Sequence, residues 1–215
     1  MRCFAILMAA GFSRRFGGQN KLLAPFRGKP LARHTLELVC GMGCFEKIIF
    51  VYADEAVAAL ADGLDVTAVY NPAPEKGQGE SARLGLTAAA QIAAVTGGAE
   101  YYMFFPCDQP LLNADTVKLL LDAARPGCIV EPANPGGNRS PSVFCASFRD
   151  ELLALKQGEH PRLLKERHKP SLIMVETVDP SLLVDIDTFE DMERLGSGVP
   201  TPYTPYPIPH YNNRI

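Results

Sequence analysis

The segment from residue 9 to residue 21 combines small residues with positive charges in a pattern that suits a phosphate-rich ligand. It reads AAGFSRRFGGQNK, so its small residues let the backbone approach a ligand closely and turn N–H groups toward it. Arg15 can bind two phosphate oxygens through its planar guanidinium, and Lys21 supplies a more mobile point charge. The segment fits neither GxxxxGKS/T nor GxGxxG. It predicts a triphosphate-binding loop, with a plain glycine-rich turn and solvated basic side chains as the alternative.

Two aspartates that lie far apart in the chain are candidate metal ligands. Asp108 follows the apolar run 101–105, and Asp187 ends the run 182–186, which we expect to form a short strand. Mg²⁺ takes a few carboxylates together with substrate phosphates and water, so the two aspartates can share one cation if both point inward. The alternatives are a turn or helix cap at Asp108 and an N-cap of the following helix at Asp187. Asp185, two residues earlier on the same expected strand face, is a weaker candidate.

The elements that must position these residues alternate along the chain. Expected strands cover residues 2–8, 47–52, 65–70, 101–105, 128–130, 142–144 and 172–175. Expected helices cover residues 30–39, 54–61, 81–95, 115–124, 148–155, 161–167 and 188–195. On helix 81–95 one face carries Leu84, Ala88, Ile92 and Val95. The alternation predicts an α/β fold, a Rossmann-like and mostly parallel sheet with helices on both faces, whose ligands bind at the carboxyl ends of the strands.

Length and composition limit the class of protein. The chain has 215 residues, of which 47% are hydrophobic and 21% charged, which is typical of a globular domain. A net charge of −3 gives little support for a nucleic-acid partner, and apolar runs such as 3–12 are far shorter than a membrane span. That first run is expected to be a buried strand, with a short secretory signal as the weaker alternative. Cysteines without CxxC spacing favour free thiols and a cytoplasmic location.

The end of the chain differs in composition from the rest. Within residues 197–215 prolines alternate with tyrosines, which rules out a regular helix or a central strand. We therefore expect residues 1–196 to form the domain and residues 197–215 to be a Pro/Tyr-rich tail. The tail is either a surface extension or a polyproline segment that docks a partner.

The loop at 9–21 also resembles a known family signature. The pattern Ala9-Ala10-Gly11-x-Ser13-x-Arg15-Phe16-Gly17, followed by Lys21, resembles the nucleotidyltransferases that activate sugars and cofactors. Within them it is most similar to the molybdenum cofactor cytidylyltransferases. Three later stretches agree in the expected order: NP at 71–72 with Gly77 and ESARLGL at 80–86, PCDQP at 106–110, and DIDTFED at 185–191. The resemblance covers about residues 2–195.

The resemblance implies an enzyme of the nucleotide-diphospho-sugar transferase fold that transfers CMP from CTP to molybdopterin and releases pyrophosphate. It implies Mg²⁺ as the cofactor, held by Asp108 and Asp187, and a recipient molybdoenzyme as a further partner. It implies catalytic roles for Arg15, Lys21 and Asp108. It implies nucleotide contacts from Ala9, Ala10, Gly11, Ser13, Arg15, Lys21, Asn71, Gly79 and Ser81. No nucleic acid or membrane is implied.

The choice of base depends on Ala10. In the resembling family an Ala-Ala-Gly start goes with cytosine and an Ala-Gly-Gly start with guanine, so this chain favours CTP over GTP. The methyl group of Ala10 can exclude a purine if the base packs against it. The alternative is that Ala10 serves only tight packing.

Two later segments depart from the family pattern. The chain has RSP at 139–141 where the family often has GHP, and GEHPR at 158–162 where it often has GDxGAR. These segments should face the second substrate, so a sugar phosphate, a polyol phosphate or another phosphorylated cofactor is an alternative acceptor. A non-catalytic nucleotide-binding chaperone or sensor is a further alternative, which the presence of Arg15, Lys21, Asp108 and Asp187 disfavours.

Overall fold

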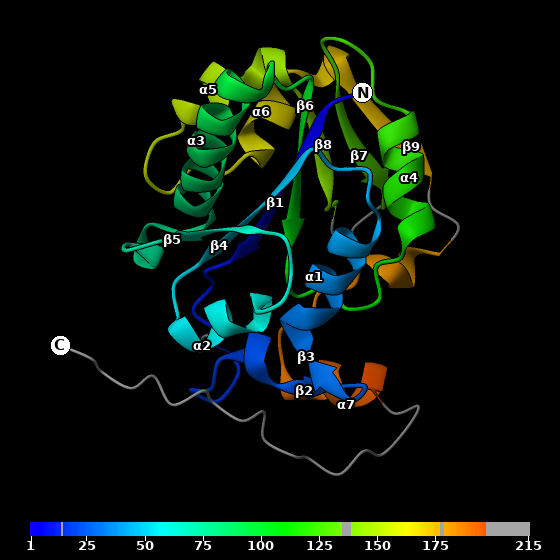
Figure 1. Cartoon of the computed structure of the whole chain (residues 1–215). Coiled ribbons are helices and arrows are strands. Elements are labelled where there is room, and N and C mark those ends of the chain that lie inside the picture. Colours follow the sequence, from blue (N-terminus) through cyan, green and yellow to red (C-terminus); the bar gives the residue numbers. More distant parts are fainter. Residues whose placement is uncertain (14, 135–138, 177–178, 197–215) are drawn as a thin grey trace, which may run out of the picture.

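Seven strands form one sheet through the centre of the molecule (Figure 1), in the order β5-β4-β1-β6-β8-β7-β9. The computed structural model describes residues 1–13, 15–134, 139–176 and 179–196. Strand β8 is antiparallel to both neighbours, and the other pairs are parallel. The strands are β1 (Cys3–Ala9), β4 (Lys47–Tyr52), β5 (Thr67–Tyr70), β6 (Tyr101–Pro106), β7 (Ile129–Ala133), β8 (Ser142–Cys145) and β9 (Leu172–Glu176), and a separate hairpin pairs β2 (Pro25–Phe26) with β3 (Lys29–Pro30). The predicted fold class is confirmed.

Strand β1 is the central strand that carries the loop at 9–21. It pairs with β4 on one side and β6 on the other, so that Leu7 lies opposite both Phe50 and Phe105. A strand buried on both faces needs a continuous apolar run rather than an alternating one, which explains the sequence of β1. Because β1 and β6 are parallel, the loop after Ala9 and the loop that carries Asp108 leave the same edge of the sheet.

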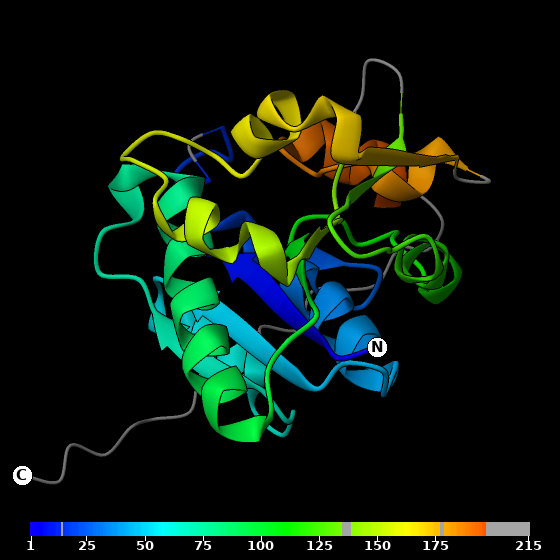
Figure 2. The ribbon, with the colours of Figure 1, turned by 90° about the horizontal axis from the view of Figure 1, so that it is seen from above.

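Helices cover both faces of the sheet, and Figure 2 shows α3 and α4 on opposite sides of β1. One apolar core includes buried residues of α1, α2 and α4, and a second includes those of α3, α5 and α6. The last helix, α7, packs beside the β2–β3 hairpin around Phe16, Phe26 and Ile186. The α-helices are α1 (Leu31–Gly41), α2 (Glu55–Ala58), α3 (Gln78–Thr96), α4 (Ala114–Asp122), α5 (Arg149–Leu153), α6 (Arg162–Arg167) and α7 (Phe189–Gly196). The 3₁₀ helices are η1 (Lys21–Leu23), η2 (Ala59–Ala61), η3 (Pro74–Lys76), η4 (Ala146–Phe148), η5 (Lys169–Ser171) and η6 (Pro180–Leu183).

The buried face of α3 is not the one that its large apolar residues suggest. The expected face comprised Leu84, Ala88, Ile92 and Val95, but Val95 is 85% exposed and the other three are only partly buried. The buried residues of α3 are Gly79, Ser81, Ala82, Gly85, Leu86, Ala89 and Ala93. Small side chains let this helix lie close to the sheet: a methyl group at Gly85 would come within 2.5 Å of Ile6 Cγ2. Close approach, rather than side-chain size, selects the buried face.

The expected strand at 182–186 is also wrong. Residues 180–183 form η6, which Asp179 caps by accepting a hydrogen bond from Ser181 N, and residues 184–187 are irregular. Leu183 and Ile186 are buried, so the apolar run packs without joining the sheet. The argument that placed Asp185 on a strand face therefore fails.

Among the described helices, none has the combination of length and apolar character that a membrane span requires. The Pro/Tyr-rich tail at 197–215 lies outside the described residues, so the division at residue 196 stays a prediction.

Candidate active site

The loop after β1 is held in shape by its own side chains. Lys21 begins η1, and the side chain of Asn20 caps this helix by accepting a hydrogen bond from Leu22 N at 3.1 Å. Ser13 Oγ accepts a hydrogen bond from Lys21 N at 3.0 Å, and Asn20 Nδ2 donates to Asp54 Oδ2 at 3.0 Å. The backbone of Lys21 is thus fixed by the protein itself, and Ser13 shapes the loop.

Four of the predicted site residues meet in one cluster of charges. Lys21 Nζ lies 2.8 Å from Asp108 Oδ2 and 2.8 Å from Asp187 Oδ1. Arg15 Nη2 lies 2.7 Å from Asp187 Oδ2. Only 11% of the Lys21 side chain is exposed, against 70% for Arg15. The cluster therefore has a shielded lysine at its centre and an accessible arginine at its edge.

The segment that carries Asp187 packs against the loop after β1 and against the Asp108 loop. Ile186 N donates a hydrogen bond to the carbonyl oxygen of Asp108 at 2.9 Å, which joins the two aspartate segments directly. Phe16 and Phe189 stack with their ring centroids 4.0 Å apart. Residues from the two ends of the described chain are thus packed against each other at the site.

The helix that follows Asp187 is capped by another residue. Thr188 Oγ1 accepts a hydrogen bond from Asp191 N at 3.1 Å, and Asp191 Oδ2 accepts one from Thr188 N at 3.0 Å. This reciprocal pair is a capping box with Thr188 as the N-cap. The Asp187 carboxylate is therefore used by Lys21 and Arg15 and does not cap the helix.

The geometry of the two aspartates suits a divalent cation. Both carboxylates face the Lys21 ammonium, so they converge on a position that already holds a positive charge. The other oxygen of Asp108, Oδ1, is buried and has no hydrogen-bond partner in the described part of the chain. No three His, Cys, Asp or Glu side chains converge within that part. Mg²⁺ is usually bound by one or two carboxylates plus phosphates and water, so this donor set fits it.

The two carboxylates keep Lys21 charged. Burial alone lowers the pKa of a lysine, but the charges of Asp108 and Asp187 and their hydrogen bonds outweigh it, so the pKa of Lys21 lies above its ordinary value. Lys21 is therefore a permanent positive charge at neutral pH.

Two adjoining cavities share this region. The smaller, of about 170 Å³, lies over the loop after β1. The larger, of about 510 Å³, extends over β6, β7, β8 and α6. Both are lined by Met8, Gln78, Pro106 and Asp108. Asp108 therefore lies where a ligand in one cavity would meet a ligand in the other.

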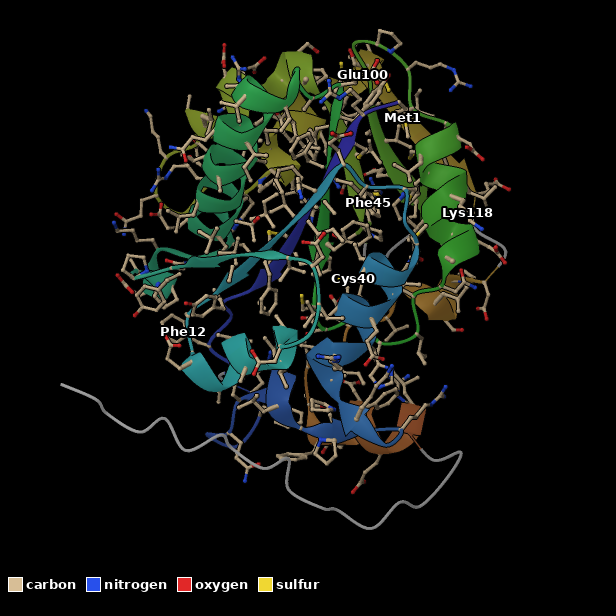
Figure 3. The ribbon with its side chains drawn as sticks, in the orientation of Figure 1. Met1, Phe12, Cys40, Phe45, Glu100 and Lys118 are labelled. Carbon is tan, nitrogen blue, oxygen red and sulfur yellow. The ribbon has the colours of Figure 1, made fainter. Side chains whose placement is uncertain are left out.

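The predicted nucleotide contacts fall into two groups. Ala10, Gly11, Lys21 and Ser81 line the smaller cavity, together with the half-exposed Phe12, which lies at the edge of the molecule near α2 in Figure 3. The predicted nucleotide contacts that line neither cavity are Ala9, Ser13, Arg15, Asn71 and Gly79. Asp187, a predicted metal ligand, also lines neither cavity.

Two of the residues that line neither cavity contact residues that form the cavity walls or lie next to them. Asn71 is fully buried and donates from Nδ2 to Ser81 Oγ at 3.0 Å, so it positions a residue of the cavity wall. Gly79 lies against the 158–160 segment, because a methyl group there would come within 1.9 Å of the Glu159 carbonyl oxygen. Their direct contact with a nucleotide stays a prediction.

Several residues of the larger cavity were not anticipated from the sequence. Glu131, Lys165 and Lys169 line it, and Glu131 is only 1% exposed. His160 also lines it, and it belongs to the segment 158–162 that was expected to face the second substrate. One signal was available: Glu131 is a charged residue inside the otherwise apolar strand β7. Lys165 and Lys169 gave no such signal, because lysines on a short helix are usually solvated.

A comparison with protein families gives this arrangement a context. A family described as the MobA-like NTP transferase domain matches residues 5–171, a range that includes Lys21 and Asp108. The chain belongs to this family. It is a nucleotidyltransferase of the MobA-like type, which confirms the family resemblance while leaving open whether it transfers a cytidylyl or a guanylyl group.

Curated relatives of this MobA-like chain carry two kinds of name. Nicotine blue oxidoreductase from Paenarthrobacter nicotinovorans is 32% identical, with 88% of this chain and 94% of that protein covered. Molybdenum cofactor guanylyltransferase from Shewanella putrefaciens is 27% identical over the same shares of the two chains.

A solved structure has the same fold. A protein from Methanothermobacter thermautotroptrophicus, described as a nucleotidyl transferase, superposes on this chain with a TM-score of 0.78 at 23% sequence identity. The superposition covers 91% of this chain and 96% of that one. At this sequence identity the similarity shows a shared fold and no more.

Proposed function

We propose that this MobA-like nucleotidyltransferase transfers CMP from CTP to molybdopterin and releases pyrophosphate. The observation that carries the proposal is the meeting of two cavities at Asp108, with Lys21 in contact with it. Transfer between two substrates requires that both be held so that the attacking oxygen reaches one phosphorus atom. A nucleotide in the smaller cavity and an acceptor in the larger one meet that requirement.

The smaller cavity supplies the groups that a triphosphate needs. Lys21 lines it, and Arg15 lies beside Asp187 at the edge of the same charge cluster. Gln78 and Ser81, in the first turn of the 19-residue helix α3, also line it, so the positive end of the helix dipole faces the cavity. We assign the β and γ phosphates to Arg15 and Lys21. Charge neutralisation and positioning are the main demands of phosphoryl-type transfer.

Asp108 and Asp187 would hold Mg²⁺ in this proposal. Bound there, the ion supplies charge neutralisation for the nucleotide phosphates. The supporting observations are the convergence of both carboxylates on one position and the Oδ1 of Asp108, which has no hydrogen-bond partner among the described residues.

CTP is proposed as the nucleotide because of Ala10. Its side chain lines the smaller cavity and is 8% exposed, so the methyl group reduces the space available to a base. A relative named as a guanylyltransferase makes GTP the direct competitor in any test.

Molybdopterin is proposed as the acceptor because the larger cavity combines apolar and charged walls. Phe104, Phe144 and Leu172 give it surface for a ring system, while Arg162 and Lys169 give it charge for anionic groups. A sugar phosphate or another phosphorylated cofactor is the alternative acceptor. A recipient molybdoenzyme and a cytoplasmic location belong to the same proposal.

A second candidate activity is redox chemistry on an aromatic substrate. The observation in its favour is the relative named nicotine blue oxidoreductase, which is 32% identical to this chain. Oxidation of a reduced nicotinamide cofactor with an aromatic acceptor, and without pyrophosphate formation, would support it over the transferase.

The deciding experiment combines nucleotides with acceptors. The purified protein is incubated with Mg²⁺ and CTP, GTP, ATP or UTP, with molybdopterin or a sugar phosphate, and pyrophosphate is measured. We expect pyrophosphate that depends on Mg²⁺ and on molybdopterin, with CTP the best nucleotide. GTP as the best nucleotide would overturn the base assignment alone, whereas no pyrophosphate with any pair would overturn the transferase proposal.

A further inference from the structure

A buried cluster of charges forms part of the wall of the larger cavity. Glu131 on β7 is 1% exposed, and its two carboxylate oxygens contact two different cations. Arg139 Nη1 lies 3.1 Å from Oε1, and Lys165 Nζ lies 3.0 Å from Oε2. Two positive charges thus share one buried carboxylate, which leaves an excess of one positive charge beside the cavity.

Lys165 is committed to the protein. Its ammonium has three N–H groups, and three oxygens lie close to it: Glu131 Oε2 at 3.0 Å, Ser142 Oγ at 2.6 Å and the carbonyl of Arg139 at 3.1 Å. Burial lowers the pKa of Lys165, and Glu131 only partly offsets this effect. Lys165 on α6 therefore holds β7, β8 and the backbone of Arg139 together, with no N–H group left for a ligand.

Arg139 is the member of the cluster that can reach a ligand. Its side chain is 48% exposed and lines the cavity. Glu131 contacts the guanidinium, and Lys165 donates a hydrogen bond to the backbone carbonyl of Arg139, so the residue is held at both its side chain and its backbone. A guanidinium has five N–H groups in a planar fork that matches phosphates and carboxylates. A fork fixed in this way loses less entropy when it binds an anion.

Charged side chains of both signs surround Arg139 in the cavity wall. The charged side chains lining the cavity are four cations and four carboxylates: Arg139, Arg162, Lys165, Lys169, Asp108, Glu131, Glu166 and Asp185. Three of the carboxylates contact cations, because Asp108 contacts Lys21, Glu166 contacts Arg162, and Glu131 is shared by Arg139 and Lys165. Arg139 also lies in one of the two segments that depart from the family pattern. That segment was expected to face the second substrate, and Arg139 lines the larger cavity.

We propose that Arg139 binds an anionic group of the acceptor, and that Glu131 and Lys165 are positioning residues that hold its guanidinium in the cavity. The inference rests on the proposed function in that it treats the larger cavity as the acceptor site. It assigns to the acceptor an oxyanion, such as a phosphate or a carboxylate, that is distinct from the phosphates of the nucleotide.

The first test measures binding of inorganic phosphate by isothermal titration calorimetry. Before each titration the protein is saturated with Mg²⁺ and a non-reacting α,β-methylene nucleotide, which is the analogue of CTP in one titration and the analogue of GTP in another. We expect Arg139→Gln to bind phosphate at least tenfold more weakly than the wild type. The matched control is Arg149→Gln, because Arg149 on α5 is also 48% exposed but lies outside both cavities. Equal phosphate binding by wild type and Arg139→Gln would overturn the proposal.

The second test separates positioning from general stability. The double variant Glu131→Gln/Lys165→Met removes both buried charges together, which avoids leaving one of them unpaired. We expect it to lose phosphate affinity as Arg139→Gln does, and expect Arg139→Gln to add no further loss in that background. Additive losses would overturn the positioning role. If the double variant does not fold, Ser142→Ala replaces it, because this change removes one contact of Lys165. We then expect phosphate affinity to be two- to threefold weaker. Unchanged phosphate affinity would count against the positioning role.

Steady-state kinetics of pyrophosphate formation distinguish this inference from the proposed function. With molybdopterin as acceptor, Arg139→Gln should raise the KM for molybdopterin about tenfold and change the KM for CTP less than twofold. A wild-type protein that forms no pyrophosphate overturns the proposed function, whereas the phosphate titration still decides whether Arg139 binds anions.

Discussion

Lys21 is held between two carboxylates and also lines the cavity proposed for the nucleotide. Its ammonium balances the charges of Asp108 and Asp187, which would otherwise repel each other across the site. The same ammonium is expected to contact the phosphates once a nucleotide arrives. Its removal should therefore affect chemistry more than folding, because 19% of the Asp108 side chain and 33% of the Asp187 side chain are exposed to water.

The first prediction is that Lys21→Ala abolishes measurable turnover. Loss of one preorganised charge at a developing anion typically costs about 10²- to 10³-fold in rate. Pyrophosphate formation measures the effect, and thermal unfolding checks that the variant is folded. Lys29→Ala is the matched control, because Lys29 also forms an ion pair, with Glu37, away from the site. Asp108→Ala should behave like Lys21→Ala, and a wild-type rate in either variant would remove it from the site.

The second prediction is that Ala10→Gly weakens the preference for CTP over GTP. Loss of the methyl group enlarges the smaller cavity where a base is proposed to pack. The ratio of the two kcat/KM values is the measurement. Ala9→Gly is the control: Ala9 is buried and lines neither cavity, so its ratio should stay unchanged. An unchanged ratio in Ala10→Gly would limit Ala10 to packing.

The third prediction concerns the alkaline pH dependence of stability. The folded-state pKa of Lys165 lies below its ordinary value of 10.5, so between that lowered pKa and 10.5 the unfolded chain binds more protons. Stability must therefore rise with pH across this window. Lys21 has the opposite sign: its contribution is complete below 10.5 and is lost as the pH rises through its raised pKa.

Comparison with Lys165→Met isolates the lysine. The free energy of unfolding, measured by urea titration at several alkaline pH values, should rise more for the wild type than for this variant as the pH approaches 10.5. A constant difference between the two proteins would contradict the buried, charge-costly environment of Lys165.

At the scale of elements, α3 shows why packing can overrule sequence periodicity. Glycine and alanine residues face the sheet, and Gly85 allows contact with Ile6 and Val51 that no side chain would permit. Helix propensity disfavours a mid-helix glycine by about 1 kcal/mol relative to alanine. The close approach that Gly85 permits offsets this intrinsic cost.

The fourth prediction compares two glycine-to-alanine changes. Gly85→Ala should destabilise the protein by about 1–3 kcal/mol, because overpacking forces the helix from the sheet. Gly41→Ala should stabilise it by up to about 1 kcal/mol, because Gly41 is in α1 with no atom within 4 Å of the added methyl. Urea unfolding measures both, and a stabilising Gly85→Ala would show that α3 can shift without cost.

The sequence was sufficient for the elements that follow simple periodicity. The buried run of β1 follows from local chemistry, and the structure confirms it. The caps that Asp54 and Asn113 form at the starts of α2 and α4 are local features of the same kind. Residues 182–186 were mistaken for a strand because an apolar run shows burial but not the partner it packs against. The Glu131–Lys165 contact joins a strand to a distant helix, so no local pattern could predict it. Family motifs placed Lys21 and Asp108. The segments 139–141 and 158–162, which were expected to face the second substrate, both contribute residues to the wall of the larger cavity.

At the scale of the whole molecule, the site depends on contacts between distant parts of the chain. The Phe16–Phe189 stack and the Arg15–Asp187 ion pair join the first loop to the last described helix and the residue near its start. A ligand that contacts both parts should stabilise the whole fold, since it binds only when they are together.

The fifth prediction is that Mg²⁺ and CTP together raise the unfolding temperature. A ligand at 100 times its Kd adds about 2.7 kcal/mol, equivalent to roughly 5–10 °C for a domain of this size. Asp187→Asn should lose most of this shift, whereas Asp150→Asn, a change at the exposed Asp150 on α5, should keep it. A full shift in Asp187→Asn, measured by differential scanning fluorimetry, would exclude Asp187 from ligand binding.

The wide separation of Lys21 and Asp187 along the chain determines when the charge cluster can form during translation. Lys21 and Asp187 are 166 residues apart, so at a synthesis rate of about 5–20 residues per second the ribosome makes the second roughly 10–30 s after the first. During that interval a nascent chain exposes its basic loop without the carboxylate that completes the cluster. Two carboxylates can therefore converge on Lys21 only after both of their loops have been synthesised.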